Sequence, residues 1–203
     1  ALEIIIRRLG LLDYARGLEI QNEARDRVLA GASDELLLLE HTPIVTLGRR
    51  GGEVDNEALQ AMNMSVLQTN RGGLATWHGP GQLVGYPIVN LHRRGINVME
   101  MVNRLGDAMR TLCQDAGIKE ATYECSRPGV YIEGRKLGAI GMHIHRGVTT
   151  HGFALNVDCD LRGFRSIVAC GQVGMETTSL AQELGQSMSM AHVLDQIEHL
   201  LNL

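Results

Sequence analysis

The sequence predicts an α+β fold: a single domain with a mixed, largely antiparallel sheet flanked by helices. Three observations lead to this fold class. Strand-like runs recur along the chain, longer segments have the apolar periodicity of amphipathic helices, and no low-complexity linker or change in composition divides residues 1–203. At 203 residues and 44% hydrophobic content, the chain is long enough to bury one sizeable core.

The first half of the chain is predicted to alternate strands and helices. Residues 2–8 form a β-branched run, and residues 13–29 have the spacing of an amphipathic helix. Two buried strands are expected on either side of Thr42-Pro43, because proline interrupts a strand ladder. The elements expected after the first helix are strands over 35–40, 44–47, 64–69 and 83–91 and a helix over 97–116.

The second half has the pattern of a meander. Three strand-like runs, over 129–132, 136–145 and 149–157, are joined by short turns that contain glycine. Residues 191–201 are predicted to form a C-terminal helix. The meander supports a sheet that is antiparallel over much of its width.

Composition argues against several function classes. A net charge of -4 and a pI of about 6.1 provide no general field for holding a nucleic-acid backbone. The apolar runs are far shorter than the roughly 18–20 residues of a membrane span, and we see no secretion signal. The four cysteines form no CxxC pair and are expected to be free thiols. We therefore expect a cytoplasmic protein with no nucleic-acid or membrane partner.

A glycine-rich segment, RGGLATWHGPGQ at residues 71–82, lies between two predicted strands. Such density indicates unusual backbone angles and a close approach to something bound, although a tight connection without a ligand has the same composition. Arg71, Thr76, His78 and Gln82 add hydrogen-bonding groups, which favours a substrate wall. The segment matches neither the GxxxxGK[ST] phosphate loop nor GxGxxG entering a helix, so nucleotide binding is disfavoured.

Two residues are candidates for reactive chemistry. Of the 19 basic residues only Lys119 and Lys136 are lysines, and Lys136 begins a predicted strand with glycines at 138 and 141. Cys170 ends an apolar run and is followed by Gly171, as an exposed loop nucleophile often is. Each has an ordinary alternative, a solvated lysine or a buried cysteine. As a pair they are more informative, because a nearby ammonium favours the reactive thiolate.

Other polar groups carry weaker predictions. His143, His145 and His151 are possible metal ligands, but no carboxylate or cysteine has suitable spacing, so no metal site is expected. Arginines at 49, 50, 93, 94, 146, 162 and 165 are candidates for a local basic patch that binds an acidic carrier protein, or are simply solvated.

Taken together, these motifs resemble the lipoyl(octanoyl) transferases of lipoate biosynthesis. The resemblance runs nearly end to end and includes Asp13-Tyr14, His41-Thr42-Pro43, RGG-x-x-T-x-HGPGQ-L-V-x-Y-P at 71–87, RKLGAIG at 135–141, HGFALNV at 151–157 and ACG at 169–171. Two positions depart from the family: Ala169 replaces a usual proline, and Trp77 replaces tyrosine or phenylalanine. The larger tryptophan is expected to affect the length of the acyl chain.

The resemblance implies kinship with the biotin/lipoate protein ligase catalytic domain. It also implies transfer of an octanoyl group from acyl carrier protein, through a thioester on Cys170, to a lysine of a lipoyl domain. The acceptors would be lipoyl domains of 2-oxoacid dehydrogenase E2 subunits and the glycine cleavage H protein. No cofactor is implied.

By the same resemblance, Cys170 is the nucleophile and Lys136 its partner. The implied substrate-contacting residues are Arg71, Gly72, Gly73, Leu74, Ala75, Thr76, Trp77, His78, Ala139, Ile140, Gly141, His151, Gly152 and Phe153. From the chemistry, we expect Lys136 rather than His78 or His151 to accept the proton of the attacking lysine. Backbone amides near Cys170 and over 79–81 are expected to bind the oxyanion.

Two alternatives remain at this point. The first is an ATP-dependent ligase of the same architecture, which would activate a free fatty acid as an adenylate and would not need Cys170. The second is a noncatalytic module that binds a lipoyl domain or an acyl carrier, in which Cys170 has no role.

Overall fold

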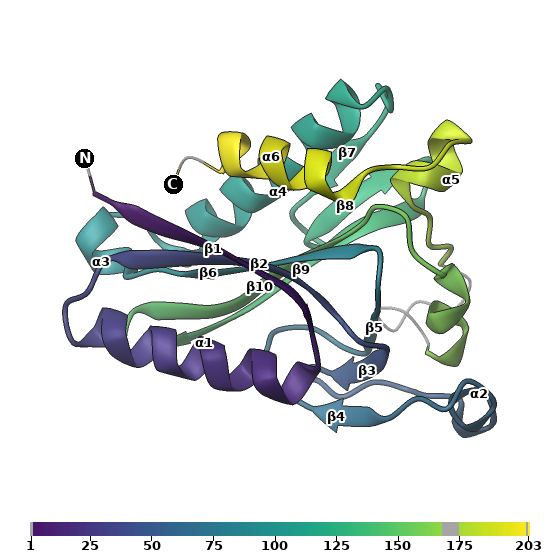
Figure 1. The fold of residues 1–203 in the computed structure, drawn as a ribbon, viewed down its shortest axis with the longest axis horizontal. Helices are drawn as coiled ribbons and strands as arrows, with labels where there is room; N and C mark the ends of the chain where they lie inside the picture. The colour runs from purple at the N-terminus through teal and green to yellow at the C-terminus, as the bar shows by residue number, and fades with distance from the viewer. Residues whose placement is uncertain (1, 168–174, 202) are drawn as a thin grey trace.

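The computed structural model describes residues 2–167, 175–201 and 203. A seven-stranded sheet runs through the centre of the molecule, with α1 and a small sheet on one side and α4 and α6 on the other (Figure 1). This arrangement is the predicted α+β fold with a mixed sheet between helices.

The main sheet is antiparallel except at one edge, where β1 and β2 run parallel. Its strands, in spatial order, are β1 (Ile4–Leu12), β2 (Asp34–His41), β6 (Gln82–Ile88), β10 (Val148–Asn156), β9 (Arg135–His145), β8 (Gly129–Ile132) and β7 (Thr122–Glu124). The predicted meander is therefore confirmed as β8, β9 and β10, which are neighbours in the sheet. The small sheet has the order β4 (Val66–Gln68), β3 (Ile44–Leu47) and β5 (Thr76–His78).

Local signals mark where the long helices begin. Helix α1 (Tyr14–Leu29) starts after Asp13, whose side chain accepts a hydrogen bond from the Arg16 amide. Helix α4 (Val98–Asp115) starts with a capping box between Asn97 and Glu100. The other helical segments are α2 (Asn56–Ala61), α3 (Leu91–Arg94), the 3-10 helix η1 (Leu161–Ser166), α5 (Leu180–Leu184) and α6 (Met190–Leu200).

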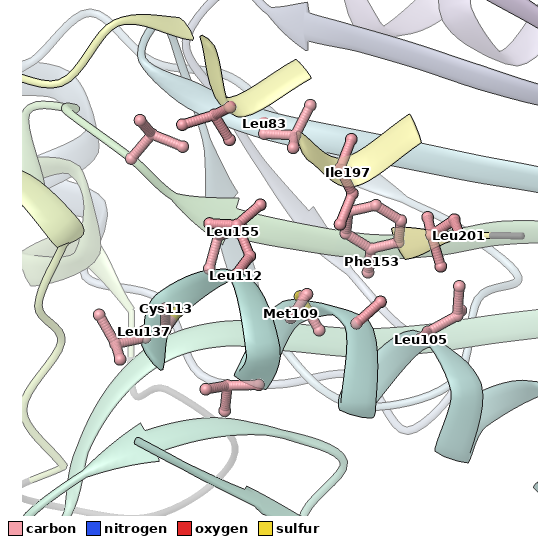
Figure 2. Close-up of a cluster of buried hydrophobic side chains, with 14 of the residues drawn as sticks. Leu83, Leu105, Met109, Leu112, Cys113, Leu137, Phe153, Leu155, Ile197 and Leu201 are labelled. Carbon is pink, nitrogen blue, oxygen red and sulfur yellow. The ribbon is translucent and has the colours of Figure 1, made fainter. Parts of the chain in front are cut away.

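The principal hydrophobic core lies between the main sheet and the layer formed by α4 and α6. Figure 2 shows side chains of α4, such as Leu105 and Leu112, packed with Phe153 and Leu155 of β10. On the opposite face, Leu37, Tyr86 and Ile88 pack with apolar residues of α1. Because strand side chains alternate between faces, both faces of the sheet contribute to burial.

Most predicted elements are found within a few residues of their expected bounds. The segment 71–82 differs, because residues 76–78 form strand β5 within it. The predicted strand over 83–91 ends at Ile88, and Leu91 begins α3. Sequence periodicity missed β5 because three residues are too few to display it.

Within the described residues, no helix has both the length and the apolar character required to cross a membrane.

Candidate functional site

A cavity of about 260 Å³ is bounded by β9 and β10 on one side and by residues 71–76 on the other. Thirteen of the residues expected to contact substrate line it: Arg71, Gly72, Gly73, Leu74, Ala75, Thr76, His78, Ala139, Ile140, Gly141, His151, Gly152 and Phe153. Lys136 also lines the cavity. The fold thus brings together three segments that are far apart in sequence.

Small residues on the sheet leave room for this cavity. Ala139 pairs with Ala154 across β9 and β10, and Gly141 pairs with Gly152. Paired residues of antiparallel strands point to the same face, so four adjacent positions carry at most a methyl group. At Gly141 a Cβ would lie 2.6 Å from the Gly72 carbonyl oxygen, so only glycine permits the loop to approach this closely.

Arg71 holds the loop in place from inside the protein. Its Nη2 atom donates to the Thr46 carbonyl at 2.9 Å and to the Leu74 carbonyl at 2.8 Å. Its Nη1 atom donates to the Gly72 carbonyl at 3.0 Å. Because these acceptors belong to β3 and to the loop itself, the buried guanidinium joins the cavity wall to the small sheet.

Lys136 lies at the start of β9 and is largely buried. Its backbone N–H donates to the Glu176 carbonyl at 2.9 Å, and its carbonyl accepts from the Thr178 N–H at 2.9 Å. Its Nζ atom lies 5.9 Å from the centroid of the Tyr131 ring. Phe164 and Thr177, which precede and follow residues 168–174, line a second small cavity together with Lys136. Cys170 and Ala169 themselves lie outside the described residues.

A chain of polar side chains connects His78 to this region. His78 Nδ1 bonds to Gln82 Oε1 at 2.7 Å, and Gln82 Nε2 donates to Asn156 Oδ1 at 3.0 Å. Asn156 Nδ2 in turn donates to the Thr178 carbonyl at 3.0 Å. Since Gln82 Oε1 is an acceptor, Nδ1 of His78 carries the proton and Nε2 is the unprotonated nitrogen.

A second polar cluster adjoins the cavity, and Tyr14, Tyr86 and His151 of this cluster line it. His41 Nδ1 donates to the Leu12 carbonyl at 3.1 Å, so its Nε2 accepts from the Tyr86 hydroxyl at 2.7 Å. The Tyr14 hydroxyl makes a long contact of 3.5 Å with His151 Nδ1. The rings of Tyr14 and His78 stack with centroids 5.7 Å apart. These groups come from α1, β2, β5, β6 and β10.

Burial keeps the histidines of the site neutral at physiological pH. It lowers the pKa of His41 to about 4 and the pKa values of His78 and His151 to about 3. Burial also raises the pKa of Tyr14 to about 12 and that of Tyr86 well above its ordinary value. The cluster therefore adds hydrogen-bonding groups to the cavity without adding charge.

His151 reaches the cavity through an unusual backbone conformation. Its cross-strand partner Met142 packs in the core beneath α4, whereas His151 contacts Tyr14 and Asn70 on the opposite side of the sheet. The φ angle of His151 is +57°, a left-handed value that is uncommon outside glycine. Such strain is stored where a side chain must be directed to a particular place.

Trp77 is not part of the cavity wall described here. Its side chain is buried in a cluster with Val45 and Leu59, and its Nε1 atom donates to Met64 Sδ at 3.2 Å. Because β5 is a strand, Trp77 points to the side opposite its neighbours Thr76 and His78. Trp77 is therefore the one expected substrate-contacting residue that does not line this cavity.

Of the expected oxyanion donors over 79–81, the Gly81 amide is already bonded within the protein. The Gly81 N–H donates to the Glu40 carboxylate at 2.7 Å, and the Gly81 carbonyl accepts from Val157 and Asp158. Gly81 has a φ of +86°, and a Cβ there would meet the backbone of Asp158. This glycine therefore fixes the connection between the small sheet and β6 rather than offering an amide to a ligand.

Several cavity residues were not among the sequence candidates. The cavity is also lined by Tyr14, Arg50, Val84, Tyr86, Ser126, Arg127, Pro128 and Ala154. Four of them lie within motifs that carry the family resemblance and could have been identified from those motifs: Tyr14, Val84, Tyr86 and Ala154. The others required knowledge of which strands are neighbours.

The remaining histidines and arginines form no obvious site. Among the described residues, no group of three or more His, Cys, Asp or Glu side chains is arranged to hold a metal ion. His145 is exposed, whereas His151 is buried against Asn70. The proposed basic patch is also weakened, because Arg93 and Arg94 pair with the buried Asp34, and Arg162 pairs with Asp160.

Comparisons with known proteins agree with this geometry. A family model described as the lipoyl protein ligase A/B catalytic domain matches residues 13–201. An octanoyltransferase of Mycolicibacterium smegmatis is 43% identical over 198 residues, which cover 95% of this chain and 85% of that protein. An octanoyltransferase of Mycobacterium tuberculosis is 42% identical over 193 residues, covering 94% of this chain and 82% of that protein.

Solved structures with this fold are much more distant in sequence. A bipartite lipoate protein ligase from Thermoplasma acidophilum, described with its E2 lipoyl domain, superposes with a TM-score of 0.74 at 15% identity. The match covers 98% of this chain and 82% of that one. A biotin protein ligase from Aquifex aeolicus, in complex with biotin and ATP, has a TM-score of 0.59 at 13% identity, covering 97% and 68%. These likenesses confirm the predicted fold class.

Proposed function

Because the chain belongs to the lipoyl protein ligase A/B catalytic domain family, we propose that it is an octanoyltransferase. It moves an octanoyl group from acyl carrier protein to a lysine of a lipoyl domain, through a thioester on Cys170. The proposal is supported by two octanoyltransferases that are 42–43% identical to this chain over 94–95% of its length and 82–85% of theirs. The acceptors are lipoyl domains of 2-oxoacid dehydrogenase E2 subunits and the glycine cleavage H protein, and the reaction takes place in the cytoplasm without a cofactor.

The position of Lys136 carries the mechanistic part of the proposal. Its side chain lines the end of the cavity, and its backbone is bonded to Glu176 and Thr178, six and eight positions after Cys170. Phe164, six positions before Cys170, lines a small cavity with Lys136. At about 3.3 Å per residue, these anchors allow the thiol to reach the lysine. We therefore place the acyl thioester at this end of the cavity.

In the first half reaction, the Cys170 thiolate attacks the carbonyl carbon of the carrier thioester. A new carbon–sulfur bond forms and the carrier thiolate leaves. The carrier thiolate takes up the proton that Cys170 had given to Lys136, which leaves the Lys136 amine neutral. A neighbouring ammonium stabilises the Cys170 thiolate, which is the role assigned to Lys136. The octanoyl chain then lies along the small residues of β9 and β10. At about 0.8 kcal/mol per buried methylene, this placement contributes roughly 4 to 5 kcal/mol to binding.

In the second half reaction, the acceptor lysine attacks the acyl-enzyme. An amide bond forms, the Cys170 thiolate leaves, and the attacking nitrogen loses its proton. His78 and His151 are poor acceptors for this proton, because burial lowers the pKa of each to about 3. Lys136 is the remaining candidate among those considered from the sequence, and we assign it the proton.

The central experiment is intact mass spectrometry of the protein after mixing with octanoyl acyl carrier protein. We expect one added octanoyl group on the wild-type protein and none on Cys170→Ser. Cys113→Ser is a matched control, because burial raises the pKa of this thiol to about 12 and it lies in the core. An adduct that persists in Cys170→Ser, or that never forms on the wild type, would contradict the proposal.

A second assay separates the transferase from an ATP-dependent ligase. The protein is incubated with free octanoate, ATP and a lipoyl domain, and AMP release is measured. We expect no AMP above background. A transferase receives its acyl group already activated as a thioester, so it does not use ATP to activate free octanoate. Robust AMP formation would favour the ligase.

A further prediction concerns the chemistry of Lys136. Lys136→Arg keeps the positive charge, but a guanidinium does not release its proton at accessible pH. We expect the acyl-enzyme to form while transfer to the lipoyl domain falls about 100-fold, within the range typical of general acid–base catalysis. Lys119→Arg, an exposed substitution of the same kind, should transfer normally. Normal transfer by Lys136→Arg would restrict Lys136 to an electrostatic role.

A further inference from the structure

His151 separates two cavities. One is the cavity of about 260 Å³ that begins at Lys136. The other, of about 380 Å³, lies between α1, the end of β4 and β10. His151 belongs to the lining of both, and it is only 3% exposed. His151 is therefore part of the partition between them.

Several contacts hold His151 in this position. The His151 backbone N–H donates to Gln21 Oε1 at 2.7 Å, which ties β10 to α1. Its Nε2 atom donates to Asn70 Oδ1 at 2.8 Å, and its Nδ1 atom faces the Tyr14 hydroxyl at 3.5 Å. The left-handed φ of +57° turns the side chain to this face of the sheet. Moving the ring aside would break these contacts together.

Lys136 and His151 lie at opposite ends of the first cavity. His151 pairs with Met142, which is six residues beyond Lys136 on β9. At about 3.3 Å per residue, this separation corresponds to roughly 20 Å between the two backbone positions. The side chains of Lys136 and His151 occupy part of that length, because both residues line the cavity. Between the two ends, the surface of the sheet that borders the cavity carries the small residues Ala139, Gly141 and Ala154. An acyl chain attached near Lys136 and laid along these residues points its methyl end toward His151.

We propose that His151 is the end-stop that limits the length of the acyl chain. This inference rests on the proposed function, since it assigns the cavity to the acyl group. A chain that fits between the thioester and His151 is accepted, and a longer chain would have to displace the imidazole. The second cavity reinforces this limit, because its lining is mostly polar, with Gln21, Asn22 and Gln68 among its side chains.

The test is a competition among donors of different length. The protein is mixed with equal amounts of hexanoyl, octanoyl, decanoyl, dodecanoyl and tetradecanoyl acyl carrier protein, and intact mass spectrometry records which acyl groups it acquires. The variants are His151→Gly, which suits the left-handed backbone, and His151→Asn, which keeps a shorter polar side chain. His145→Ala, an exposed histidine on the same hairpin, is the matched control.

We expect His151→Gly to raise the ratio of dodecanoyl to octanoyl adduct about ten-fold, and His151→Asn to raise it less. His145→Ala should keep the wild-type ratio. A gain of longer adducts cannot come from unfolding, since an unfolded protein would lose all adducts. If both His151 variants form adducts in the wild-type ratio, the end-stop is overturned while the transferase stands. If the wild type forms no adduct with any donor, the proposed function itself fails.

Discussion

The two faces of the main sheet are built differently, although they are formed by the same strands. Toward α4 and α6, large side chains such as Leu83, Leu137 and Leu155 fill the space completely. Toward α1, the face is divided: Leu37 and Ile88 pack under the helix, while Ala139 and Ala154 leave a cavity beneath the loop at 71–76. One face of this sheet is packed with large apolar side chains, whereas part of the other face borders a cavity.

Polar side chains are also distributed unequally between the two faces of the main sheet. The face toward α1 carries a cluster of His41, His78, Tyr86 and His151, in which hydrogen bonds satisfy the ring nitrogens and hydroxyls that contact one another. In the core toward α4, the most polarisable groups are the sulfur atoms of Met101, Met109, Cys113 and Met142. A buried polar cluster costs free energy unless it is paired, so its presence beside the cavity indicates a role in ligand placement.

The largest expected effect is on the filled face. Leu112 is fully buried in α4, and Leu112→Ala should lower the free energy of unfolding by about 2 to 5 kcal/mol, since it leaves a void in a packed core. Octanoyl transfer per folded molecule should be unchanged. Chemical denaturation measures the first quantity and the acylation assay the second.

Leu11→Ala is the matched control, because Leu11 is 53% exposed. It should change the free energy of unfolding by less than about 1 kcal/mol. A loss of transfer in folded Leu112→Ala would show that the two faces are not independent.

A smaller effect is expected from filling the cavity. Ala154→Leu projects three extra carbons into the slot and displaces about two methylenes of the acyl chain. At about 0.8 kcal/mol each, this corresponds to a loss of octanoyl transfer of roughly ten-fold. The free energy of unfolding should change little, because the added atoms enter a cavity that is left open by the side chains of residues 2–167 and 175–201.

Ala32→Leu adds the same atoms at an exposed position and should alter neither property. Transfer rates measured with octanoyl and hexanoyl donors give the decisive comparison, because the loss of rate should be smaller for the shorter hexanoyl chain. Equal losses for both donors would contradict the assignment of the slot.

The smallest effect is the response of the polar cluster to acid. His78 and His151 have pKa values of about 3 in the folded protein, against about 6.5 in an unfolded chain. Above pH 6.5 both states are neutral at these residues. Below it, the unfolded chain binds protons that the folded protein excludes, so stability falls as pH falls. Each histidine should account for about 1 kcal/mol between pH 6 and pH 5.

Urea denaturation at pH 7, 6 and 5 tests this dependence. His78→Gln should give a shallower decline than the wild type, whereas His145→Gln, at an exposed position, should follow it. If the free energy of unfolding falls equally with pH in the wild type and in His78→Gln, burial does not prevent protonation of His78.

Much of the fold was predictable because its signals are local. Helix α1 was expected to start at Asp13, and Asp13 is its cap; the helix expected from residue 97 starts with the capping box of Asn97. Strand β8 was predicted with its observed bounds. Strand β5 was missed, and with it the direction of Trp77, because a three-residue strand shows too little alternation to reveal which face a side chain occupies.

The sequence by itself determined the elements, the family and the segments that line the cavity, because cap residues, periodicity and ordered motifs are properties of the chain. Only the tertiary structure decided which side chains meet there. Tyr14, His41 and Tyr86 join His151 because β2, β6 and β10 are neighbours under α1, and strand order is a long-range property. The left-handed backbone of His151 likewise depends on Gln21 and Asn70, which lie 130 and 81 positions away in sequence.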